Sequence, residues 1–313
     1  MKILVVGSSG YIGRHVVKAL AEQGAQVVGF DLVPESSTIA GATFLTGNMT
    51  NLEEVMAAIV EHRIQRIVAL GYFMTPLLAS ECRDLLNAAR VNIVGVANLF
   101  EAARLARLQR VIFASTVGIF GHQDAYGPEP INEETEPHAP PKSLYGLMKL
   151  VNNSMAERYM KTYGIQIVKV HSAAVIGPGN TAFSRRMIQF PALGKPGFGN
   201  WPSSGPRNIV GVSDIAQLYS KIALADEVKH DTYMGTGPSP TGREIADIVK
   251  SYVPDAEIAF DEKARVPAWN FANSRAVDEF KWKIQSVEAM VLDEINGTRK
   301  AAGLPLVSGS PSD

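Results

Sequence analysis

Apolar and polar positions alternate along the first half of the chain in blocks that indicate strands and helices in turn. Apolar residues recur at helical spacing in three longer segments, 14–23, 51–63 and 84–103. Short apolar runs typical of strands buried on both faces stand around these segments, at 2–6, 26–30, 43–46, 66–71, 110–116 and 165–170. This alternation predicts an α/β fold in which helices cover both faces of a doubly wound parallel sheet.

A glycine-rich turn joins the first strand to the first helix. Gly7-Ser8-Ser9-Gly10-Tyr11-Ile12-Gly13 follows the strand directly, and the second strand ends at Asp31. In a Rossmann-type fold such glycines let the backbone approach a pyrophosphate, and the helix N-terminus offers free N–H groups to its charge. Asp31 can accept hydrogen bonds from both adenosine ribose hydroxyls and would repel a 2′-phosphate. The segment predicts a site for NAD rather than NADP, with contacts from Gly7, Ser9, Gly10, Tyr11, Ile12, Gly13 and Asp31.

The ends of the third and fourth strands face the same edge of the sheet as this turn. Four residues at these ends are expected to border the cofactor: Asn48, Met49, Leu70 and Gly71. The loop that follows, Tyr72 to Pro76, is unusually apolar and aromatic. We expect Phe73 to border the nicotinamide or the substrate, with burial of the loop under the next helix as the alternative.

Glycine and proline accumulate between residues 177 and 206, which predicts a departure from the sheet into a second lobe. We expect a Rossmann-type NAD-binding domain of residues 1–175, to which 207–233 return. The remaining segments, 176–206 and 234–302, are expected to form a smaller C-terminal α/β substrate-binding lobe. The tail, 303–313, is rich in Ser, Gly and Pro and is expected to be disordered.

Composition narrows the class of protein. A length of 313 residues suffices for one nucleotide-binding domain and a smaller lobe, and a net charge of −1 without a basic stripe argues against nucleic-acid binding. The single cysteine, Cys82, excludes an internal disulfide framework and fits a reducing compartment. No apolar run approaches the ~18 residues of a membrane span, and Met1-Lys2 leads into a strand rather than a signal peptide. We expect a cytoplasmic protein without a metal site.

Hydroxyl side chains and a Y-x-x-x-K motif supply the candidate chemistry. The strand at 110–116 ends in Ser115-Thr116, and a polar, proline-rich loop then leads to Tyr145-Gly146-Leu147-Met148-Lys149. Residues four apart share a helix face, so Tyr145 and Lys149 are expected to point the same way. The motif alone is common, but it becomes specific when it follows a glycine turn and a hydroxyl-ended strand.

This order of features resembles the extended short-chain dehydrogenase/reductases, the NAD-dependent epimerase/dehydratase family, over about residues 1–300. The resemblance implies Thr116, Tyr145 and Lys149 as the catalytic set, with Tyr145 and Lys149 also contacting the cofactor. It further implies that Asn92 supports the lysine through its backbone and a bound water.

The implied chemistry follows from the side chains. A phenol is a poor base at neutral pH because its pKa is near 10. The Lys149 ammonium and a positively charged nicotinamide ring would favour the phenolate and lower the pKa of Tyr145. Tyr145 would then exchange a proton with the substrate oxygen that Thr116 holds, while hydride moves between the substrate carbon and the nicotinamide.

Several positions depart from the usual pattern of this family. Asn48 stands where an acid usually meets the adenine amino group, although its amide oxygen can still accept that hydrogen bond. Val117 and Gly118 replace the Asp-Glu pair of sugar 4,6-dehydratases, which argues against a dehydratase. Ala174 replaces an asparagine that contacts nucleotide-sugar phosphates, and His171 replaces a common arginine.

The substrate is the least determined part of the interpretation. The resemblance implies that Arg207 and Arg265 clamp the pyrophosphate of a nucleotide sugar, a task that suits forked guanidinium donors. The residues expected at the substrate site are Phe73, Thr116, Val117, His171, Ala174, Arg207 and Arg265.

Three functions are compatible with these residues. We expect an NAD-dependent oxidoreductase acting on a secondary alcohol or ketone. The alternatives are a nucleotide-sugar epimerase that keeps its NAD bound and, less favoured, a cofactor-binding regulatory protein. By the same resemblance we expect a homodimer formed through the helix near 84–103 and the helix that carries Tyr145.

Overall fold

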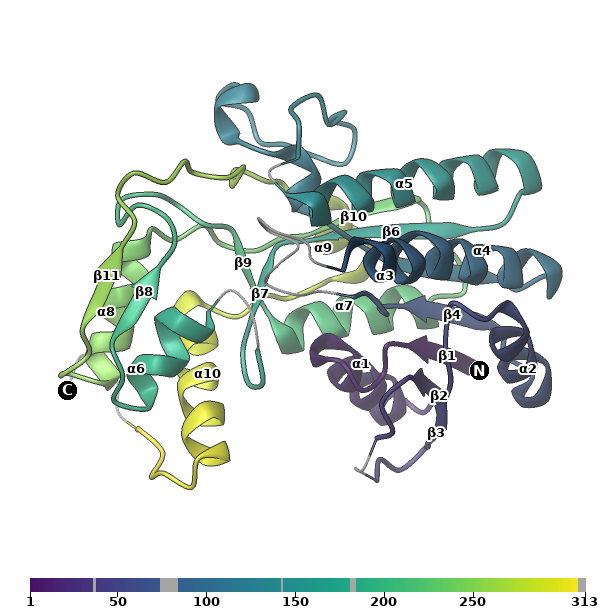
Figure 1. Cartoon of the computed structure of the whole chain (residues 1–313), viewed down its shortest axis with the longest axis horizontal. Helices are drawn as coiled ribbons and strands as arrows, with labels where there is room; N and C mark the ends of the chain where they lie inside the picture. The colour runs from purple at the N-terminus through teal and green to yellow at the C-terminus, as the bar shows by residue number, and fades with distance from the viewer. Residues whose placement is uncertain (36–37, 74–83, 142, 181–183, 309–313) are drawn as a thin grey trace.

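The computed structural model describes the chain over residues 1–35, 38–73, 84–141, 143–180 and 184–308. Its centre is a parallel sheet of seven strands: β1 Lys2–Val6, β2 Gln26–Asp31, β3 Ala42–Thr46, β4 Arg66–Ala69, β5 Arg110–Thr116, β6 Ile167–Ser172 and β10 Thr232–Gly235. The strands lie in the order β10-β6-β5-β4-β1-β2-β3 (Figure 1). All strands are parallel, but the order in which they are added to the sheet reverses between β1 and β4. The carboxyl ends of these two strands therefore border the crevice where such sheets bind ligands.

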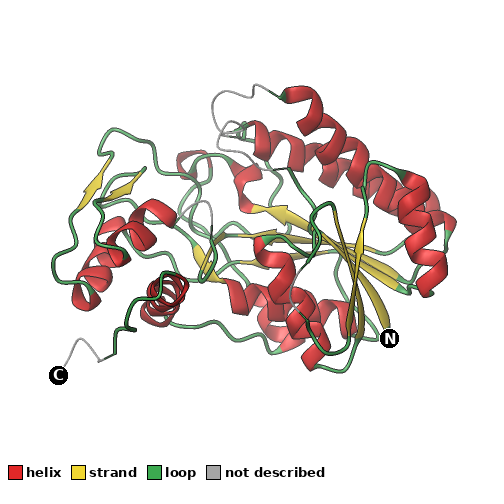
Figure 2. Ribbon diagram, turned by 60° about the horizontal axis from the view of Figure 1, so that its bottom comes forward, coloured by secondary structure: helices red, strands yellow, loops and turns green. Residues whose placement is uncertain are grey.

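Each face of this sheet is covered by its own set of helices (Figure 2). One face carries α1 (Tyr11–Glu22), α7 (Val212–Leu224) and α9 (Ser274–Phe280). The other face carries α2 (Leu52–His62), α4 (Val96–Leu105) and α5 (Leu144–Tyr163). In β1, Ile3 and Val5 are buried on the first face, while Leu4 and Val6 are buried on the second. Burial on both faces explains the continuous apolar runs and confirms the doubly wound α/β expectation.

The single helix expected over 84–103 is interrupted. The structure has α3 at Leu85–Ala89, a π-helical turn at Arg90–Gly95 and then α4. Asn92 lies in this turn, and its side chain hydrogen-bonds the backbone of Phe73 in the loop after β4. Helical structure thus covers the predicted range, but the π-helical turn within it was not predicted; π-turns of this kind are frequent at functional sites.

The remaining elements form a smaller lobe at one end of the sheet (Figure 1). Its strands pair in two short parallel sheets, β7 (Ala174–Ile176) with β9 (Ile209–Gly211) and β8 (Gly197–Gly199) with β11 (Ile258–Phe260). Its helices are α6 (Phe190–Ala192), α8 (Gly242–Tyr252) and α10 (Val287–Ala301). Thr241 caps α8 in a capping box with Glu244.

Three boundaries differ from the expectation. Within residues 207–233, β9 pairs with β7 of the smaller lobe, whereas α7 and β10 rejoin the main domain. Helix α9, from the segment 234–302 expected in the lobe, also packs on the main sheet. Val307 exchanges two backbone hydrogen bonds with the side chain of Asn296 on α10, so the described part of the expected disordered tail is held against that helix. Within the described residues no helix has the length and apolar character needed to cross a membrane.

Candidate active site

The glycine turn between β1 and α1 brings backbone segments closer together than side chains would allow. Gly7 has a φ of +84°, and a Cβ atom there would lie 2.5 Å from the backbone nitrogen of Gly71. A Cβ atom on Gly13 would lie 1.9 Å from the carbonyl oxygen of Gly7. These positions therefore require glycine. The turn, the N-terminus of α1 and the end of β4 together form a backbone cradle suited to a pyrophosphate.

Asp31 lies beside this cradle at the end of β2. Its Oδ2 accepts a hydrogen bond from the backbone N–H of Ser9 at 3.1 Å, and its Oδ1 accepts one from Val33 at 3.0 Å. A carboxylate can accept about four hydrogen bonds, so both oxygens keep capacity for ribose hydroxyls. The cradle and the positioned acid fit the adenosine diphosphate half of NAD. The Tyr11 hydroxyl donates to the carbonyl of Gly177 at 3.3 Å and links the turn to the second lobe.

The other residues expected to bind cofactor lie around the cradle, but two are engaged within the chain. Asn48 Oδ1 accepts hydrogen bonds from the backbone N–H and the hydroxyl of Thr50, at 2.9 and 2.8 Å. Both lone pairs of that oxygen are occupied, so an adenine amino group would have to displace Thr50. Met49 is buried and packs against Gly71. Three further residues expected to bind the cofactor also lie at this cradle. Gly10 and Ile12 are at the start of α1, and Leu70 follows β4.

Thr116, Tyr145 and Lys149 come together at the carboxyl end of β5. Thr116 ends that strand, and its Oγ1 accepts a hydrogen bond from the Gly118 N–H at 3.0 Å. A Cβ atom on Gly146 would lie 2.7 Å from the Gly118 carbonyl, so α5 starts in close contact with the turn after β5. One helical turn later, Lys149 Nζ donates to the carbonyl of Ala114 at 2.5 Å.

Burial dominates the ionisation of the two motif residues. It raises the pKa of Tyr145 to about 12, and a hydrogen bond with Thr116 acts in the opposite direction. Burial also lowers the pKa of Lys149 well below its ordinary value. A Tyr145 pKa lowered by the Lys149 ammonium was expected, and the described residues produce the opposite direction. Desolvation is the larger influence on Tyr145, and it also disfavours the charged form of Lys149, whose Nζ lies 5.8 Å from the centre of the Tyr145 ring.

Asn92 acts through the loop after β4. Its Oδ1 accepts a hydrogen bond from the Phe73 N–H at 2.7 Å, and its Nδ2 donates to the Phe73 carbonyl at 3.0 Å. Its own carbonyl accepts a hydrogen bond from Asn152 Nδ2 at 2.9 Å. The backbone group that the resemblance assigns to a bound water is thus used by Asn152, one turn beyond Lys149.

Tyr72 is a site residue that sequence reasoning did not single out. Its ring centre lies 3.6 Å from Lys149 Nζ, and its ring meets that of Tyr145 edge to face at 5.4 Å. The only signal in the sequence was the aromatic pair Tyr72-Phe73, and a pattern of composition does not tell which ring turns toward the helix. Met74 to Pro76 of the same loop, and Cys82, lie outside the described residues.

The residues expected to bind substrate do not all lie at a common site. His171 is buried between β6 and α5, where it interacts with Asn153 Nδ2 at 3.2 Å. Burial lowers its pKa to about 3, so it is neutral. These surroundings correct the expectation of a substrate contact: His171 has the position of a core side chain. Val117 lies in the turn after Thr116, and Ala174 begins β7 beside Asn208.

The two arginines of the second lobe differ in their surroundings. Arg207 lies with its guanidinium 5.8 Å from the centre of the Trp201 ring, and burial lowers its pKa to about 10. Arg265 is exposed and forms an ion pair with Asp124 from the loop after β5, at 2.5 Å. An anionic ligand would therefore stabilise Arg207 strongly, whereas at Arg265 it would compete with Asp124.

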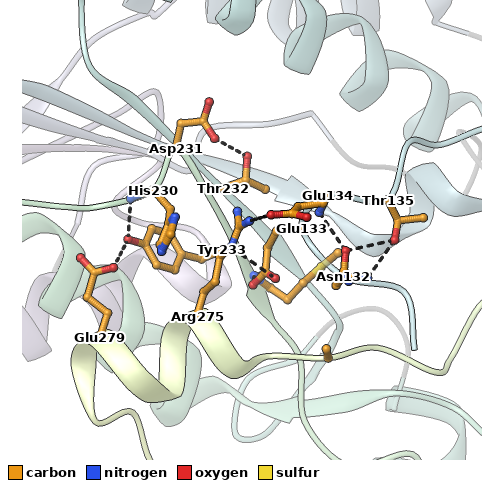
Figure 3. Close-up of polar contacts among 12 residues, drawn as sticks. Asn132, Glu133, Glu134, Thr135, His230, Asp231, Thr232, Tyr233, Arg275 and Glu279 are labelled. Carbon is orange, nitrogen blue, oxygen red and sulfur yellow. Dashed lines mark hydrogen bonds and ion pairs between the residues drawn. The ribbon is translucent and has the colours of Figure 1, made fainter. Parts of the chain in front are cut away.

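A polar network holds the loop that precedes α5 (Figure 3). Glu133 is buried, and its Oε1 accepts a hydrogen bond from the Met234 N–H at 3.0 Å. Arg275 of α9 pairs with Glu134 at 2.7 Å and approaches Glu133 at 3.9 Å. Tyr233 of β10 donates to Glu279 of α9 at 2.6 Å in the same region. The contacts of Glu133 and Glu134 tie the loop to β10 and α9.

Comparison with known proteins agrees with this geometry. The model of the NAD dependent epimerase/dehydratase family matches residues 3–233. The chain belongs to this family. Curated relatives in the family include Protein CapI of Staphylococcus aureus, 25% identical over 260 residues that make up 77% of this chain and 74% of the relative. UDP-glucose 4-epimerase of Erwinia amylovora is 27% identical over 251 residues, 71% of this chain and 73% of that enzyme.

Solved structures share the fold over nearly the whole chain. UDP-glucose 4-epimerase of Thermus thermophilus, in complex with NAD, superposes with a TM-score of 0.83 at 21% identity, covering 96% of this chain and 100% of that one. A GalE-like L-threonine dehydrogenase from Cupriavidus necator superposes with a TM-score of 0.79 at 22% identity, covering 94% and 99%. This epimerase/dehydratase family member is thus an NAD-dependent enzyme of the extended short-chain dehydrogenase/reductase type.

Proposed function

We propose that this enzyme is an oxidoreductase that moves hydride between the nicotinamide of NAD and the carbon of a secondary alcohol or ketone. The observation that carries the proposal is the convergence of the Thr116 hydroxyl, the Tyr145 phenol and Lys149 at the carboxyl end of β5. That edge of the sheet also holds the glycine cradle and Asp31, which would bind the cofactor.

Each residue has a distinct task in this proposal. Thr116 holds the substrate oxygen by a hydrogen bond, and Tyr145 accepts or returns the proton of that same oxygen. Lys149 holds a positive charge near the phenol, which favours its ionised form. NAD, when bound, supplies the hydride acceptor and the positive charge of its oxidised ring. Asp31 and the N-terminus of α1 would orient the adenosine and pyrophosphate.

A UDP-sugar epimerase is the second candidate, and two observations favour it. Several relatives are UDP-glucose 4-epimerases. Arg207 is a half-buried residue of the second lobe whose pKa is lowered by burial, and a diphosphate would stabilise its charge. Against it stand Ala174 in place of an asparagine and the ion pair that occupies Arg265.

Cofactor turnover separates the two candidates. An oxidoreductase consumes free NAD as it consumes substrate, so NADH absorbance rises with added NAD. An epimerase returns the hydride to the same molecule and works with bound NAD alone. The purified protein is first analysed by absorbance and mass for bound cofactor, then supplied with secondary alcohols and UDP-sugars with and without added NAD. Conversion of a UDP-sugar without added NAD would replace the first proposal by the second.

Diphosphate binding provides an independent measurement at Arg207. If the substrate is a nucleotide sugar, UDP should raise the melting temperature, and Arg207→Ala should abolish the shift. A charged hydrogen bond of this kind contributes about 1.5–3 kcal/mol. Lys250→Ala, which removes an exposed cation from α8, should leave the shift intact. If UDP does not protect the unmodified protein, the nucleotide-sugar candidate loses its main support.

The preference for NAD over NADP is expected to depend on Asp31. Asp31→Ala combined with Leu32→Arg should weaken NAD binding about 10- to 100-fold, the equivalent of one charged hydrogen bond, and strengthen NADP binding. Leu32 is 58% exposed, so an arginine fits there without disturbing the core. Both cofactors are titrated calorimetrically, with Leu32→Ala as the control. NADP binding by the unmodified protein that equals NAD binding would refute the assignment.

We also propose a homodimer formed through α3, the π-turn and α5. These elements expose apolar side chains that a second copy could bury: Leu86, Val94, Leu147 and Val151, between 42% and 64% exposed. A light-scattering mass of a single chain at micromolar concentration would count against this proposal.

A cytoplasmic location remains the expectation drawn from the reducing-compartment argument for Cys82.

A further inference from the structure

The Lys149 ammonium is enclosed by aromatic rings. Its Nζ lies 3.6 Å from the centre of the Tyr72 ring, 4.8 Å from that of Phe113 and 5.8 Å from that of Tyr145. Its side chain is buried, and the carbonyl of Ala114 is its hydrogen-bond acceptor. Among the ion pairs of the described residues, none involves Lys149.

This enclosure poses a physical problem. Removing an ammonium from water disfavours its charged form, and burial lowers the pKa of Lys149 well below its ordinary value. The face of an aromatic ring carries negative charge density and attracts a cation, most strongly where both are desolvated. Of the three rings, that of Tyr72 is the nearest and contributes the largest part of this attraction.

Two asparagines hold Tyr72 in place. The Asn92 side chain makes two hydrogen bonds to the backbone of Phe73, the next residue in the chain. Asn152 donates to the Asn92 carbonyl and lies close enough to Tyr72 to influence its hydroxyl. The Tyr72 hydroxyl and Asn152 Oδ1 are both buried, and neither has a hydrogen bond of normal geometry to a described residue. The ring is the part of Tyr72 that lies against Lys149, with its centre 3.6 Å from Nζ.

We propose that Tyr72 is a positioning residue, whose ring face holds the Lys149 ammonium beside the catalytic phenol of Tyr145. Tyr72 acts through Lys149, and the inference rests on the proposed role of the Tyr145–Lys149 pair. The edge-to-face contact between the Tyr72 and Tyr145 rings fixes the geometry of all three side chains at once. The titratable groups that face Lys149 are Tyr72, from the loop after β4, and Tyr145, on its own helix.

The proposal separates two substitutions of the same residue. Tyr72→Phe keeps the ring face and removes a buried hydroxyl that lacks a normal hydrogen bond, so the Lys149 charge should be unaffected. Tyr72→Leu removes the ring, so the charged form of Lys149 loses stabilisation and its pKa falls further. With less positive charge nearby, the pKa of Tyr145 rises, and the rising limb of the activity profile for oxidation moves to higher pH.

The experiment follows Lys149 itself and requires neither cofactor nor substrate. The protein is labelled with ¹³C at the lysine side chains, and the Lys149 signal is assigned by its absence from Lys149→Met. The unmodified protein and Tyr72→Phe should titrate within a few tenths of a pH unit of each other. Tyr72→Leu should titrate about one unit lower, equivalent to ~1.4 kcal/mol. Tyr159→Leu removes a tyrosine from the same helix-covered core and should not shift the signal.

Several results of these titrations would overturn the proposal. An unchanged Lys149 titration in Tyr72→Leu, or an equal shift in Tyr72→Phe, would overturn the proposal. Should Tyr72→Leu fail to fold, the unmodified protein still tests it, because protons held over a ring face resonate upfield. Normal Lys149 side-chain shifts there would also overturn it. A shift in Tyr72→Leu alongside full activity of Tyr145→Phe would instead leave Tyr72 as the holder of Lys149 and refute the proposed catalytic role of the pair.

Discussion

Replacing Tyr145 with phenylalanine is expected to lower turnover by roughly 10²–10⁴-fold, the usual contribution of a positioned acid or base. The substitution keeps the ring and removes only the ionisable oxygen. The edge-to-face packing on Tyr72 therefore survives, and the start of α5 is still fixed by the contact between Gly146 and Gly118. NAD should bind with little change, because the glycine cradle and Asp31 hold its adenosine half. Turnover is measured on the substrate found by the cofactor test, and binding by calorimetry.

The matched control is Tyr163→Phe, which removes a hydroxyl from the last turn of the same helix. Tyr163 is 53% exposed and far along α5 from the motif, so this variant should retain full activity. If Tyr145→Phe keeps near-full activity while it binds NAD normally, Tyr145 is not the acid or base. The regulatory-protein alternative would then return to consideration, together with other chemistries at Thr116.

The main architecture was predictable because its determinants are local in sequence. Strands buried on both faces must be apolar throughout, so β1, β5 and the others stand out as runs. The glycine turn was readable for a related reason: at Gly7 and Gly13 a side chain would collide with backbone, so the residue type reports the geometry. The pairing of Tyr145 with Lys149 follows from helical periodicity alone.

The features that were missed depend on contacts between distant segments. The π-turn at Asn92 forms where that side chain bonds the backbone of Phe73, and no pattern within 84–103 encodes it. The approach of the Tyr72 ring to Lys149 brings the loop after β4 against a helix far along the chain. Arg265 illustrates the same limit, since its partner Asp124 comes from a loop more than a hundred residues earlier. Residue type alone can identify such side chains as candidate site residues, but only the fold determines which groups each of them contacts.

The direction in which the pKa of Tyr145 is shifted shows how burial changes an argument based on charge alone. Charge favours the phenolate, whereas burial disfavours it and raises the pKa of Tyr145 to about 12. Burial also lowers the pKa of Lys149, so the lysine remains charged only while its surroundings support the ammonium. In the proposed mechanism the phenolate of Tyr145 therefore depends on the positive charge that Lys149 and the oxidised nicotinamide would contribute together. Loss of either contribution should be visible in the pH dependence.

Lys149→Met is accordingly expected to impair both binding and chemistry. It removes the ammonium that would contact the nicotinamide ribose, so NAD affinity should fall about 10- to 100-fold, the equivalent of one charged hydrogen bond. It also removes a positive charge near Tyr145, so turnover at neutral pH should fall by roughly 10²-fold or more. Methionine matches the length of the lysine stem and relieves the burial of a charge, so the melting temperature should not fall.

The pH profile gives the decisive measurement for this variant. In the oxidation direction the phenolate is the active form, so activity rises with pH through the apparent pKa of Tyr145. We expect that pKa to lie well below 10 in the unmodified enzyme with NAD bound. In Lys149→Met the charge that favoured the phenolate is gone, so the limb should move upward, toward the value of about 12 that burial produces. Lys161→Met, at an exposed position in the last turn of α5, should leave the limb in place. An unshifted limb in Lys149→Met would show that Lys149 does not act on the ionisation of Tyr145, even if NAD binding is weakened.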